Sequence, residues 1–477
     1  MLKRTKIVCT IGPSSESPKI ILKLIKAGMN VARLNFSHGT QAWHGGVIKI
    51  IRKISKELGE PVGILADLQG PRIRVGEVAA AGIKLNPKDK VTLTTNLKNE
   101  KNKIPVTYEN LHKDLAPGNR VLLDEGLLEL KVLKIAGRDI FCEVMVGGVL
   151  TSHKGINLPD SSVSLPPLTE KDKKDLEFAV ARGVDWVALS FVSRASEVYD
   201  LRYLIQALEH KLKIPKGLPI KIIAKIEKHE ALANFDEILE AVDGIMVARG
   251  DLGIETPAED VPLWQKKIID KCLAVAKPVI VATQMLDSMI RKPRPTRAEV
   301  SDVANAVIDH TDAIMLSGET ASGAYPLLAV QTMDKIVRET EKSIYDDLVM
   351  ASIMKNIKNI DDAVSQVAKI LSKTVEAKVI LVASLSGYAG RIVARYRPEL
   401  PILVATDNER VERQLALSWG VVPFVLPPCR TVEELVDRSI GYIKKNKFVS
   451  GGDKIIIIAG EPVGRSGNVN LIEIKAI

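Results

Sequence analysis

The sequence predicts an α/β protein: a (β/α)8 barrel, a small β-barrel domain inserted after its third strand, and an open α/β domain at the carboxyl end. Three observations predict this fold. Apolar runs of strand length alternate with segments of helical periodicity along most of the 477 residues. One interval between two such runs is several times longer than the others. A second series of apolar runs follows the eighth strand–helix unit.

The first series of apolar runs counts out eight strands. A helical segment follows each run except the third, as the repeating units of a parallel barrel require. The strand runs begin near Thr5, Asn30, Val62, Val184, Pro219, Asp243, Pro278 and Asp312. The helical segments include Pro18–Ala27, Trp43–Leu58, Glu170–Arg182, Pro262–Ala276 and Arg297–His310.

The interval after the third strand indicates an inserted domain. Val62 and Val184 are 122 residues apart, whereas the other strand starts follow one another at about 24 to 35 residues, a spacing that fits βαβ units. Short alternating strand patterns and turns within the interval are typical of a small β-barrel. The expected domains are residues 1–70 with 168–344 (barrel), 71–167 (insert) and 345–477 (carboxyl-terminal α/β domain).

The last domain is expected to form a separate open sheet. Its strand patterns are KVILVAS, PILVATD, VVPFVL and DKIIIIAG. Helical patterns at Asn408–Trp419 and Val432–Lys445 alternate with them. Before this domain, a helix from Pro326 to about Ile344 completes the eighth barrel unit.

Composition favours a soluble protein in the cytoplasm. The chain is 46% hydrophobic and 26% charged, which is typical of a soluble globular protein. Its four cysteines are scattered, which indicates reduced thiols in a cytosolic protein. We expect no signal segment, and the sequence shows no membrane-spanning apolar run and no HExxH or HxH zinc spacing. The net charge of +9 suits either nucleic acid or small anionic substrates, but the basic residues are not clustered. We expect no membrane and no nucleic-acid partner.

The stretch IKIIAKIEKHEAL, residues 220–232, combines a buried strand with charge. Alternation places Lys225 and Glu227 on the same side of the strand end. A local ion pair explains such a pair alone, whereas the sharper hypothesis is a phosphate-facing lysine beside a metal-binding carboxylate. An amphipathic helix is expected to open at His229 and Glu230, with an apolar stripe of Leu232, Phe235, Leu239 and Val242.

Polar residues end most of the other predicted strands, where barrel enzymes place their chemistry. Any one of them is explained by helix capping, but all of them together favour an active site. These strand ends are Arg33-Leu34-Asn35-Phe36-Ser37-His38, Asp67-Leu68-Gln69-Gly70 with Arg72 and Arg74, Lys225-Ile226-Glu227, Arg249-Gly250-Asp251, Thr283-Gln284 and Ser317-Gly318-Glu319-Thr320.

The residue types at the strand ends select phosphoryl transfer. Glu227 and Asp251 are hard oxygen ligands suited to Mg²⁺ or Mn²⁺. Arg33, Arg74 and Lys225 are cations that can clamp phosphoryl oxygens. The sequence has no Ser-His-Asp order, no dinucleotide fingerprint and no GxxxxGK[ST] loop. The remaining reaction class is phosphoryl transfer without a P-loop, in which the protein positions the reactants and stabilises their charge.

Seven segments, in order, resemble the pyruvate kinase family: TKIVCTIGPSS, GMNVARLNFSHG, ADLQGPRIR, IKIIAKIEKHEAL, VARGDLGIE, VATQMLDSMI and MLSGETASGAYP. They are spread over nearly the whole barrel region, so the resemblance is very specific. It implies the transfer of a phosphoryl group from phosphoenolpyruvate to ADP, which gives pyruvate and ATP in the last step of glycolysis. It also implies Mg²⁺ or Mn²⁺, a homotetramer and allosteric control.

The resemblance also assigns roles to single residues. Lys225, Thr283 and Arg33 correspond to catalytic positions, and Thr283 is expected near the carbon that is protonated when the enolate collapses. The substrate positions are Arg33, Lys225, Gly250, Asp251 and Thr283, and the divalent-metal positions are Glu227 and Asp251. The nucleotide positions are Asn35, Ser37, His38, Arg74 and Lys154. Because Lys154 lies in the insert, the insert is expected to act as a lid that closes over ATP.

One departure from the family pattern concerns K⁺. Many members hold this ion at positions matching Asn35, Ser37, Asp67 and the carbonyl of Leu68, and they carry the sequence DTKGPEIR. This chain reads DLQGPRIR. Arg72 would supply a fixed positive charge where K⁺ otherwise acts. We therefore expect that K⁺ is not required.

The carboxyl-terminal domain resembles the allosteric module of the family. Short Ser/Gly loops after strands bind anions, although ordinary turns use the same residues. Ala389 replaces a usual hydroxyl, and Asn468-Val469-Asn470 only partly follows the usual loop. The expected effector is a phosphorylated small molecule, and the expected effector residues are Ser384, Ser386, Gly387, Gly464, Ser466 and Gly467.

Two alternatives stay open at this point. One is another Mg²⁺-dependent barrel enzyme that handles phosphoenolpyruvate or pyruvate, such as a dikinase or an aldolase. A dikinase needs a phosphorylatable histidine on a mobile domain, and an aldolase does not explain a lid that carries Lys154. The other is a non-catalytic protein that binds nucleic acid through its positive charge, for which salt-sensitive RNA binding without phosphoryl transfer is the discriminating observation.

Overall fold

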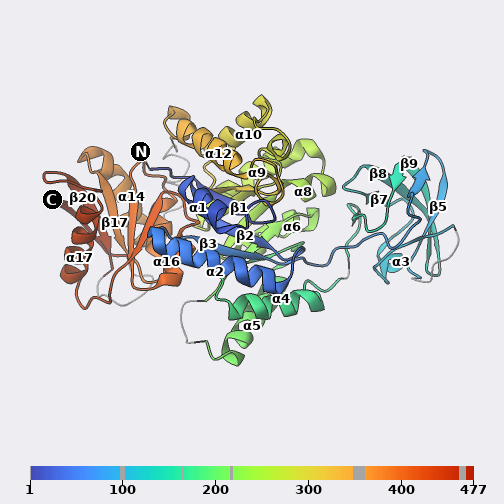
Figure 1. Cartoon of the computed structure of the whole chain (residues 1–477), viewed down its shortest axis with the longest axis horizontal. Helices are drawn as coiled ribbons and strands as arrows, with labels where there is room; N and C mark the ends of the chain where they lie inside the picture. Colours follow the sequence, from blue (N-terminus) through green and yellow to red (C-terminus); the bar gives the residue numbers. More distant parts are fainter. Residues whose placement is uncertain (1, 97–101, 164, 215–218, 348–359, 461–468) are drawn as a thin grey trace.

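The computed structural model describes residues 2–96, 102–163, 165–214, 219–347, 360–460 and 469–477. Three parts lie side by side (Figure 1): the sheet of the carboxyl-terminal residues, a central barrel with its helices, and a β-rich unit formed by residues between β3 and β12. This arrangement confirms the predicted fold class.

The central part is a closed barrel of eight parallel strands in the order β1-β16-β15-β14-β13-β12-β3-β2. The predicted strand starts lie within two residues of the observed ones. The strands are β1 (Lys6–Thr10), β2 (Met29–Asn35), β3 (Gly63–Asp67), β12 (Trp186–Leu189), β13 (Lys221–Ile226), β14 (Gly244–Ala248), β15 (Val279–Ala282) and β16 (Ala313–Leu316).

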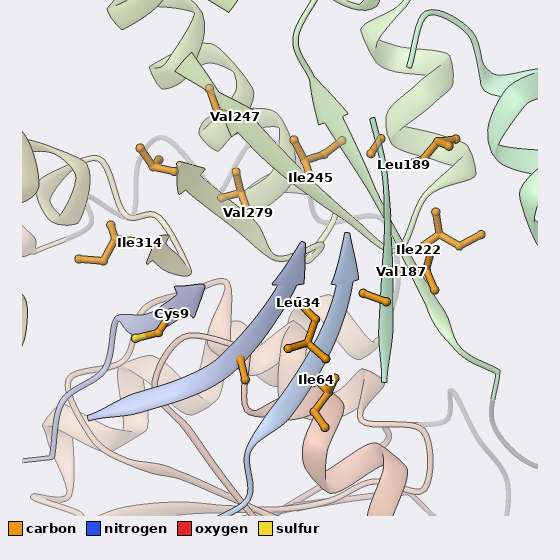
Figure 2. Close-up of a cluster of buried hydrophobic side chains, with 14 of the residues drawn as sticks. Cys9, Leu34, Ile64, Val187, Leu189, Ile222, Ile245, Val247, Val279 and Ile314 are labelled. Carbon is orange, nitrogen blue, oxygen red and sulfur yellow. The ribbon is translucent and has the colours of Figure 1, made fainter. Parts of the chain in front are cut away.

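Alternation along each strand builds two apolar layers. Val8, Val31 and Leu65 belong to a cluster to which all eight barrel strands contribute. The alternate residues, among them Cys9 and Leu34, belong to a larger cluster that includes helix residues (Figure 2). Both layers are almost fully buried, so the barrel is a packed core and its chemistry is confined to its ends.

Helices follow the barrel strands, and threonines begin several of them. Thr40 caps α2, while Thr169 and Thr296 form capping boxes at α4 and α10. The helices of this part are α1 (Pro18–Lys26), α2 (Gln41–Leu58), α4 (Glu170–Ala181), α5 (Ala195–Lys211), α6 (His229–Ala233), α7 (Phe235–Ala241), α8 (Arg249–Glu255), α9 (Val261–Ala274), α10 (Arg297–Ile308), α11 (Gly318–Ala321) and α12 (Pro326–Thr340).

Two predicted helices end differently. The helix expected to open at His229 is broken into α6 and α7 at Asn234, whose side-chain Nδ2 donates to the Ser193 carbonyl over 2.9 Å. The four residues of its predicted apolar stripe are nevertheless buried. The helix expected to run to about Ile344 ends at Thr340, and a 3-10 turn, η3 (Ile344–Asp346), follows it.

The unit between β3 and β12 contains a six-stranded sheet, β11-β7-β8-β9-β5-β6, and a two-stranded sheet, β10-β4. It has a hydrophobic core of its own. Its elements are β4 (Ile83–Leu85), β5 (Lys90–Thr94), β6 (Ile104–Pro105), α3 (Leu111–Asp114), β7 (Arg120–Leu123), β8 (Leu128–Ala136), β9 (Asp139–Val146), β10 (Gly148–Leu150) and β11 (Ile156–Asn157).

Residues 73–76 connect the two edges of the six-stranded sheet. On the β11 side, Ile156 N donates to Ile73 O over 3.0 Å. On the β6 side, Gly76 N donates to Pro105 O over 2.7 Å. One extended segment thereby satisfies both sheet edges, as a small closed barrel requires.

The carboxyl-terminal part is an open sheet in the order β19-β18-β17-β20-β21. The antiparallel edge strand β21 was not predicted, and the helix expected over Asn408–Trp419 is shorter. The elements are α14 (Ile360–Thr374), β17 (Val379–Ala383), α15 (Tyr388–Ala394), β18 (Ile402–Thr406), α16 (Glu409–Leu415), β19 (Val421–Val425), α17 (Val432–Lys445), β20 (Lys454–Ala459) and β21 (Leu471–Ala476).

The carboxyl-terminal part packs against the amino-terminal ends of the barrel strands, here called the base of the barrel. Leu417 is fully buried within the cluster of inward-facing barrel residues. Asp185, just before β12, accepts from Arg413 Nε over 2.9 Å. Asp312, just before β16, accepts from Trp419 N over 3.1 Å. The opposite, carboxyl-terminal ends of the strands, here called the rim, carry the predicted site.

None of the helices in the described residues is long and apolar enough to cross a membrane.

Candidate active site

Lys225, near the end of β13, is the centre of a cluster of charges at the rim. Its Nζ lies 2.8 Å from Glu227 Oε1, donates to Ser190 Oγ over 3.0 Å, and lies 3.6 Å from Asp67 Oδ1. The side chain is 12% exposed, and those of both carboxylates are 1% exposed. The predicted convergence of Lys225 and Glu227 is therefore present, and Asp67 joins it.

Burial and charge compete at this lysine. Desolvation alone lowers the pKa of Lys225, but the carboxylates of Asp67 and Glu227 outweigh it, so that the net shift of the pKa is upward. Burial likewise raises the pKa of Asp67, yet Lys225 and Arg33 bring it below the usual value. Lys225 is therefore an ammonium and Asp67 a carboxylate at neutral pH.

Arg33 joins the cluster from the neighbouring strand β2. The β2–β3 register pairs Arg33 with Leu65 and places Asn35 opposite Asp67. Arg33 Nε donates to Asp67 Oδ2 over 2.6 Å, and Nη1 donates to Thr10 Oγ1 over 2.9 Å. Asp67 thus holds two cations next to each other at the rim.

Ser190 was not predicted as part of the site. Its hydroxyl donates to the Leu68 carbonyl over 2.8 Å and accepts from Lys225. Ser190 directly follows β12, which is the fourth barrel strand in the chain; no residue had been proposed at the end of this strand or of β1. Its position after the apolar run WVAL was the available signal.

The two oxygens of Glu227 have different partners. Oε2 accepts from the backbone N of Phe191 over 2.6 Å. Oε1 is buried and receives no hydrogen bond, although it lies beside the Lys225 ammonium. Burial raises the pKa of Glu227, and the carboxylate of Asp251 raises it further. A bound cation relieves such a repulsion between acids.

Asp251 lies in the first turn of α8 and contacts Arg72. Arg72 Nη2 is 3.8 Å from Asp251 Oδ1. By its resemblance to the family, Arg72 is expected at a monovalent-cation position with Asn35, Ser37, Asp67 and Leu68. Among the described residues its recorded ion pair is instead with Asp251, while Asp67 pairs with Arg33 and Lys225.

Thr283 follows β15 and faces the start of α8. The β14–β15 register pairs Ala248 with Ala282, so that residues 249–250 and 283 are neighbours. Thr283 Oγ1 accepts from Gly250 N over 2.8 Å and donates to Ala282 O over 2.6 Å. Thr283 and Gln284 both have positive φ, 72° and 55°. Neither is glycine, so the surroundings hold a strained turn here.

A cleft of about 1140 Å³ opens beside these residues. Arg72, Glu125, Gly250, Asp251 and Thr283 are among its lining residues, so both the rim and the β-rich insert contribute to it. Lys225, Arg33, Asp67 and Glu227 are not among its lining residues, so the cleft covers only the Gly250–Thr283 side of the rim.

The predicted nucleotide residues form two groups. Asn35, Ser37 and His38 lie after β2, where Ser37 N donates to Asn35 Oδ1 over 3.1 Å. Arg74 and Lys154 lie in the insert, where Lys154 pairs with Asp124 at 2.8 Å. No contact between the two groups is recorded among the described residues.

The residues present fit a divalent cation. The part of the chain that the structure describes contains no cluster of three or more His, Cys, Asp and Glu side chains suited to a metal. Mg²⁺, however, takes only one or two carboxylates and completes its shell with water and substrate oxygens. Glu227 Oε1, buried and without a hydrogen bond, is the kind of oxygen such an ion requires.

The predicted effector loop is only partly described. Ser384 Oγ accepts from Ala389 N over 3.3 Å, and Ser386 Oγ accepts from Tyr388 N over 3.4 Å. Gly387 has φ 75°, and a Cβ there would lie 2.9 Å from Leu415 Cδ2, so glycine is required. Gly464, Ser466 and Gly467 lie outside the described residues.

Fold and site together define a barrel phosphotransferase whose catalytic barrel carries a β insert and is followed by an α/β domain. Sequence comparison agrees: a family described as pyruvate kinase, barrel domain, matches residues 2–330, and pyruvate kinase, alpha/beta domain, matches residues 362–475. The chain belongs to the pyruvate kinase family.

Individual relatives support this assignment over the full length. The chain is 46% identical to a pyruvate kinase of Geobacillus stearothermophilus over 100% of this chain and 81% of that protein. It is 43% identical to a pyruvate kinase of Clostridium acetobutylicum over 100% of both. The crystal structure of a pyruvate kinase from Cryptosporidium parvum superposes with a TM-score of 0.93 at 37% identity, covering 99% of this chain and 96% of that one.

Proposed function

We propose that this enzyme transfers the phosphoryl group of phosphoenolpyruvate to ADP in a Mg²⁺- or Mn²⁺-dependent reaction, giving pyruvate and ATP as in the last step of glycolysis. The observation that carries the proposal is the cluster of Lys225, Arg33 and Asp67 at the rim, beside the carboxylate of Glu227. Two buried cations fixed by one carboxylate form a preorganised site for an anion whose charge increases during transfer.

Lys225 and Arg33 bind the phosphoryl oxygens in this proposal. Asp67 orients both cations before substrate arrives, so little reorganisation is needed during the reaction. The bond between phosphorus and the enol oxygen breaks, and a new bond forms to a terminal oxygen of ADP. The enolate that remains takes up a proton at carbon.

Glu227 and Asp251 would hold the divalent ion. When bound, that ion supplies positive charge to the phosphoryl and enolate oxygens. The backbone at Gly250 and Asp251 receives the substrate carboxylate. Thr283 lies next to Gly250 and acts in the protonation of the enolate carbon through water, because its own proton is engaged with the Ala282 carbonyl.

Asn35, Ser37, His38, Arg74 and Lys154 bind the nucleotide. Because Arg74 and Lys154 belong to the insert, the insert acts as a lid that brings its cations to the phosphates. The insert already touches the barrel: Asn157 Nδ2 donates to Glu255 Oε1 of α8 over 2.9 Å.

Arg72 takes the place of K⁺ in this proposal, so the reaction does not require that ion. Its guanidinium is a permanent charge, and its pairing with Asp251 keeps it at the cleft. Asn35, Ser37, Asp67 and the Leu68 carbonyl are the matching ligands, and Ser190 already donates to that carbonyl.

The proposal extends to regulation and assembly. A phosphorylated small molecule binds at Ser384, Ser386 and Gly387, together with Gly464, Ser466 and Gly467. The family resemblance supports a homotetramer, a location in the cytoplasm, and domain bounds of 1–70 with 168–344, 71–167 and 345–477.

A coupled assay of pyruvate formation from phosphoenolpyruvate and ADP tests the proposal. Lys225→Met keeps the volume and removes the charge, and it is expected to lower turnover about 10³-fold, since removing one stabilising donor typically costs 10²- to 10³-fold. Lys211→Met, which removes an exposed ion pair with Glu177, is the matched control and is expected to keep full turnover. Turnover that survives Lys225→Met would refute the assigned role of Lys225.

A further inference from the structure

The side chain of Arg249 braces the strained turn at Thr283 and Gln284. Arg249 is the first residue of α8, directly after β14. Its Nη2 donates to the Thr283 carbonyl over 2.9 Å and lies 2.8 Å from Met285 Sδ. Because both residues of the turn have positive φ, contacts around the turn must hold this unfavourable conformation in place.

Asp302, on α10, locks this arginine. Asp302 Oδ1 accepts from Arg249 Nη1 over 2.7 Å, and Oδ2 accepts from Nη2 over 2.7 Å. The Arg249 side chain is 12% exposed and that of Asp302 is 35% exposed. Two parallel hydrogen bonds fix the plane of a guanidinium, which a single bond does not. The plane of the guanidinium in turn decides whether Nη2 reaches the Thr283 carbonyl.

The contact from Arg249 controls the orientation of both the backbone carbonyl and the hydroxyl of Thr283. Its backbone carbonyl is held by Arg249, and its hydroxyl accepts from Gly250 N. Rotation of the turn would move the hydroxyl away from Gly250 and away from the cleft that both residues line. A displacement of about 1 Å at a reacting group lowers rates by about 10²-fold.

We propose that Arg249 and Asp302 are positioning residues for the protonation step, acting through the Thr283–Gln284 turn. The inference rests on the proposed function, since it deepens the role given to Thr283 there. Asp302 lies on an outer helix and is not assigned to substrate, metal or nucleotide. Its loss affects proton transfer to the enolate carbon more than the binding of phosphoenolpyruvate.

The test measures proton transfer separately from the whole reaction. Exchange of the pyruvate methyl hydrogens with D₂O, followed by proton NMR with Mg²⁺ and ATP present, reports enolisation alone. Steady-state assays give kcat, the KM for phosphoenolpyruvate and the solvent isotope effect on kcat. The proteins are the full-length parent, Asp302→Asn, Arg249→Lys and a control, Asp236→Asn, which removes an exposed ion pair with Lys271 on the outer barrel surface.

Asp302→Asn and Arg249→Lys are expected to slow methyl exchange about tenfold or more, to increase the solvent isotope effect, and to change KM less than about twofold. Asp236→Asn is expected to match the parent. The inference is overturned if exchange stays near the parental rate in folded variants, or if exchange, turnover and thermal stability fall in parallel, as a purely structural pair would cause. If the parent itself neither forms pyruvate nor exchanges its methyl hydrogens, the proposed function fails instead.

Discussion

The rim and the base of the barrel both bury charged side chains, but they hold them in different ways. At the base, Asp185 accepts from Arg52 Nη2 over 2.7 Å, from Ile64 N over 2.8 Å and from Arg413 Nε over 2.9 Å. Both of its oxygens are satisfied by donors of fixed geometry. At the rim, Glu227 keeps one buried oxygen without a hydrogen bond.

The backbone is strained at both ends. Phe191, Thr283 and Gln284 at the rim have positive φ without being glycine, and so do Ala276 and His310 at the base. At the base, Asp185, Asp243 and Asp312 precede alternate strands and accept backbone N–H groups of neighbouring strands. The difference teaches that buried carboxylates serve different partners at the two ends: at the base they hold backbone N–H groups and arginines, whereas at the rim Asp67 holds the ammonium of Lys225 and the guanidinium of Arg33.

Breaking a satisfied charge at the base should cost stability and leave chemistry intact. Asp185→Asn removes one partner of two buried arginine contacts, and the loss of one member of a buried pair typically costs about 3–5 kcal/mol. We expect a clearly lower thermal midpoint, followed by tryptophan fluorescence, with turnover at 25 °C close to the parental value. A large loss of turnover at an unchanged midpoint would contradict the division between the two ends.

Leu417 tests the apolar part of the same contact. It is fully buried among inward-facing barrel residues although it comes from the carboxyl-terminal part. Leu417→Ala should lower the free energy of unfolding by about 2–5 kcal/mol, as cavity-forming leucine substitutions do. Leu263→Ala, at an exposed site on α9, is the control and should change little. Equal midpoints for both variants would show that Leu417 does not contribute to the core.

Arg72 lies at the rim, where a substitution should affect turnover and not the free energy of unfolding. Arg72→Glu restores an acid where the K⁺-dependent members of the family carry one. Turnover should fall about tenfold in tetramethylammonium buffer and recover on addition of K⁺, because the fixed charge is lost. Turnover of the parent should not depend on K⁺. A parent that needs K⁺ would overturn the assignment.

Lys6 gives a dependence of stability on pH at the base. Burial, followed by the repulsion of the neighbouring Lys3, lowers the pKa of Lys6 to about 7. Glu341, Glu60 and Asp312 act in the opposite direction. The Lys6 ammonium donates to Val421 O over 2.7 Å.

The sign of this effect follows from proton binding. Between pH 7 and about 10 the unfolded chain binds the Lys6 proton and the folded chain does not, so stability should rise with pH across that window, by up to about 1 kcal/mol per unit. Lys6→Met should flatten this slope in urea unfolding curves. A slope that is the same in both proteins would exclude Lys6 as its source.

Local pattern was enough to predict most of the architecture. The eight strand starts, the insert and four of the five carboxyl-terminal strands follow from apolar runs and spacing. The approach of Lys225 to Glu227 follows from alternation along one strand. These features depend on residues close together in the chain, for which periodicity carries the information.

The features that were missed depend on contacts between distant segments. The break at Asn234 is accompanied by a hydrogen bond to Ser193, 41 residues earlier. The strained turn at Thr283 contains no glycine to mark it, and it is held by Arg249, 34 residues earlier. β21 is largely exposed, so its apolar alternation is weak. Ser190 gains meaning only when β12 lies between β3 and β13.

The position of Leu417 has a consequence for how such chains can be shortened or recombined. One end of the barrel is closed by a leucine side chain that belongs to another folding unit. An isolated barrel ending at residue 347 would therefore expose an apolar opening to water. A terminal unit taken from a relative must therefore provide an apolar side chain of matching size at this position. The two units are thus less independent than their separate sheets suggest.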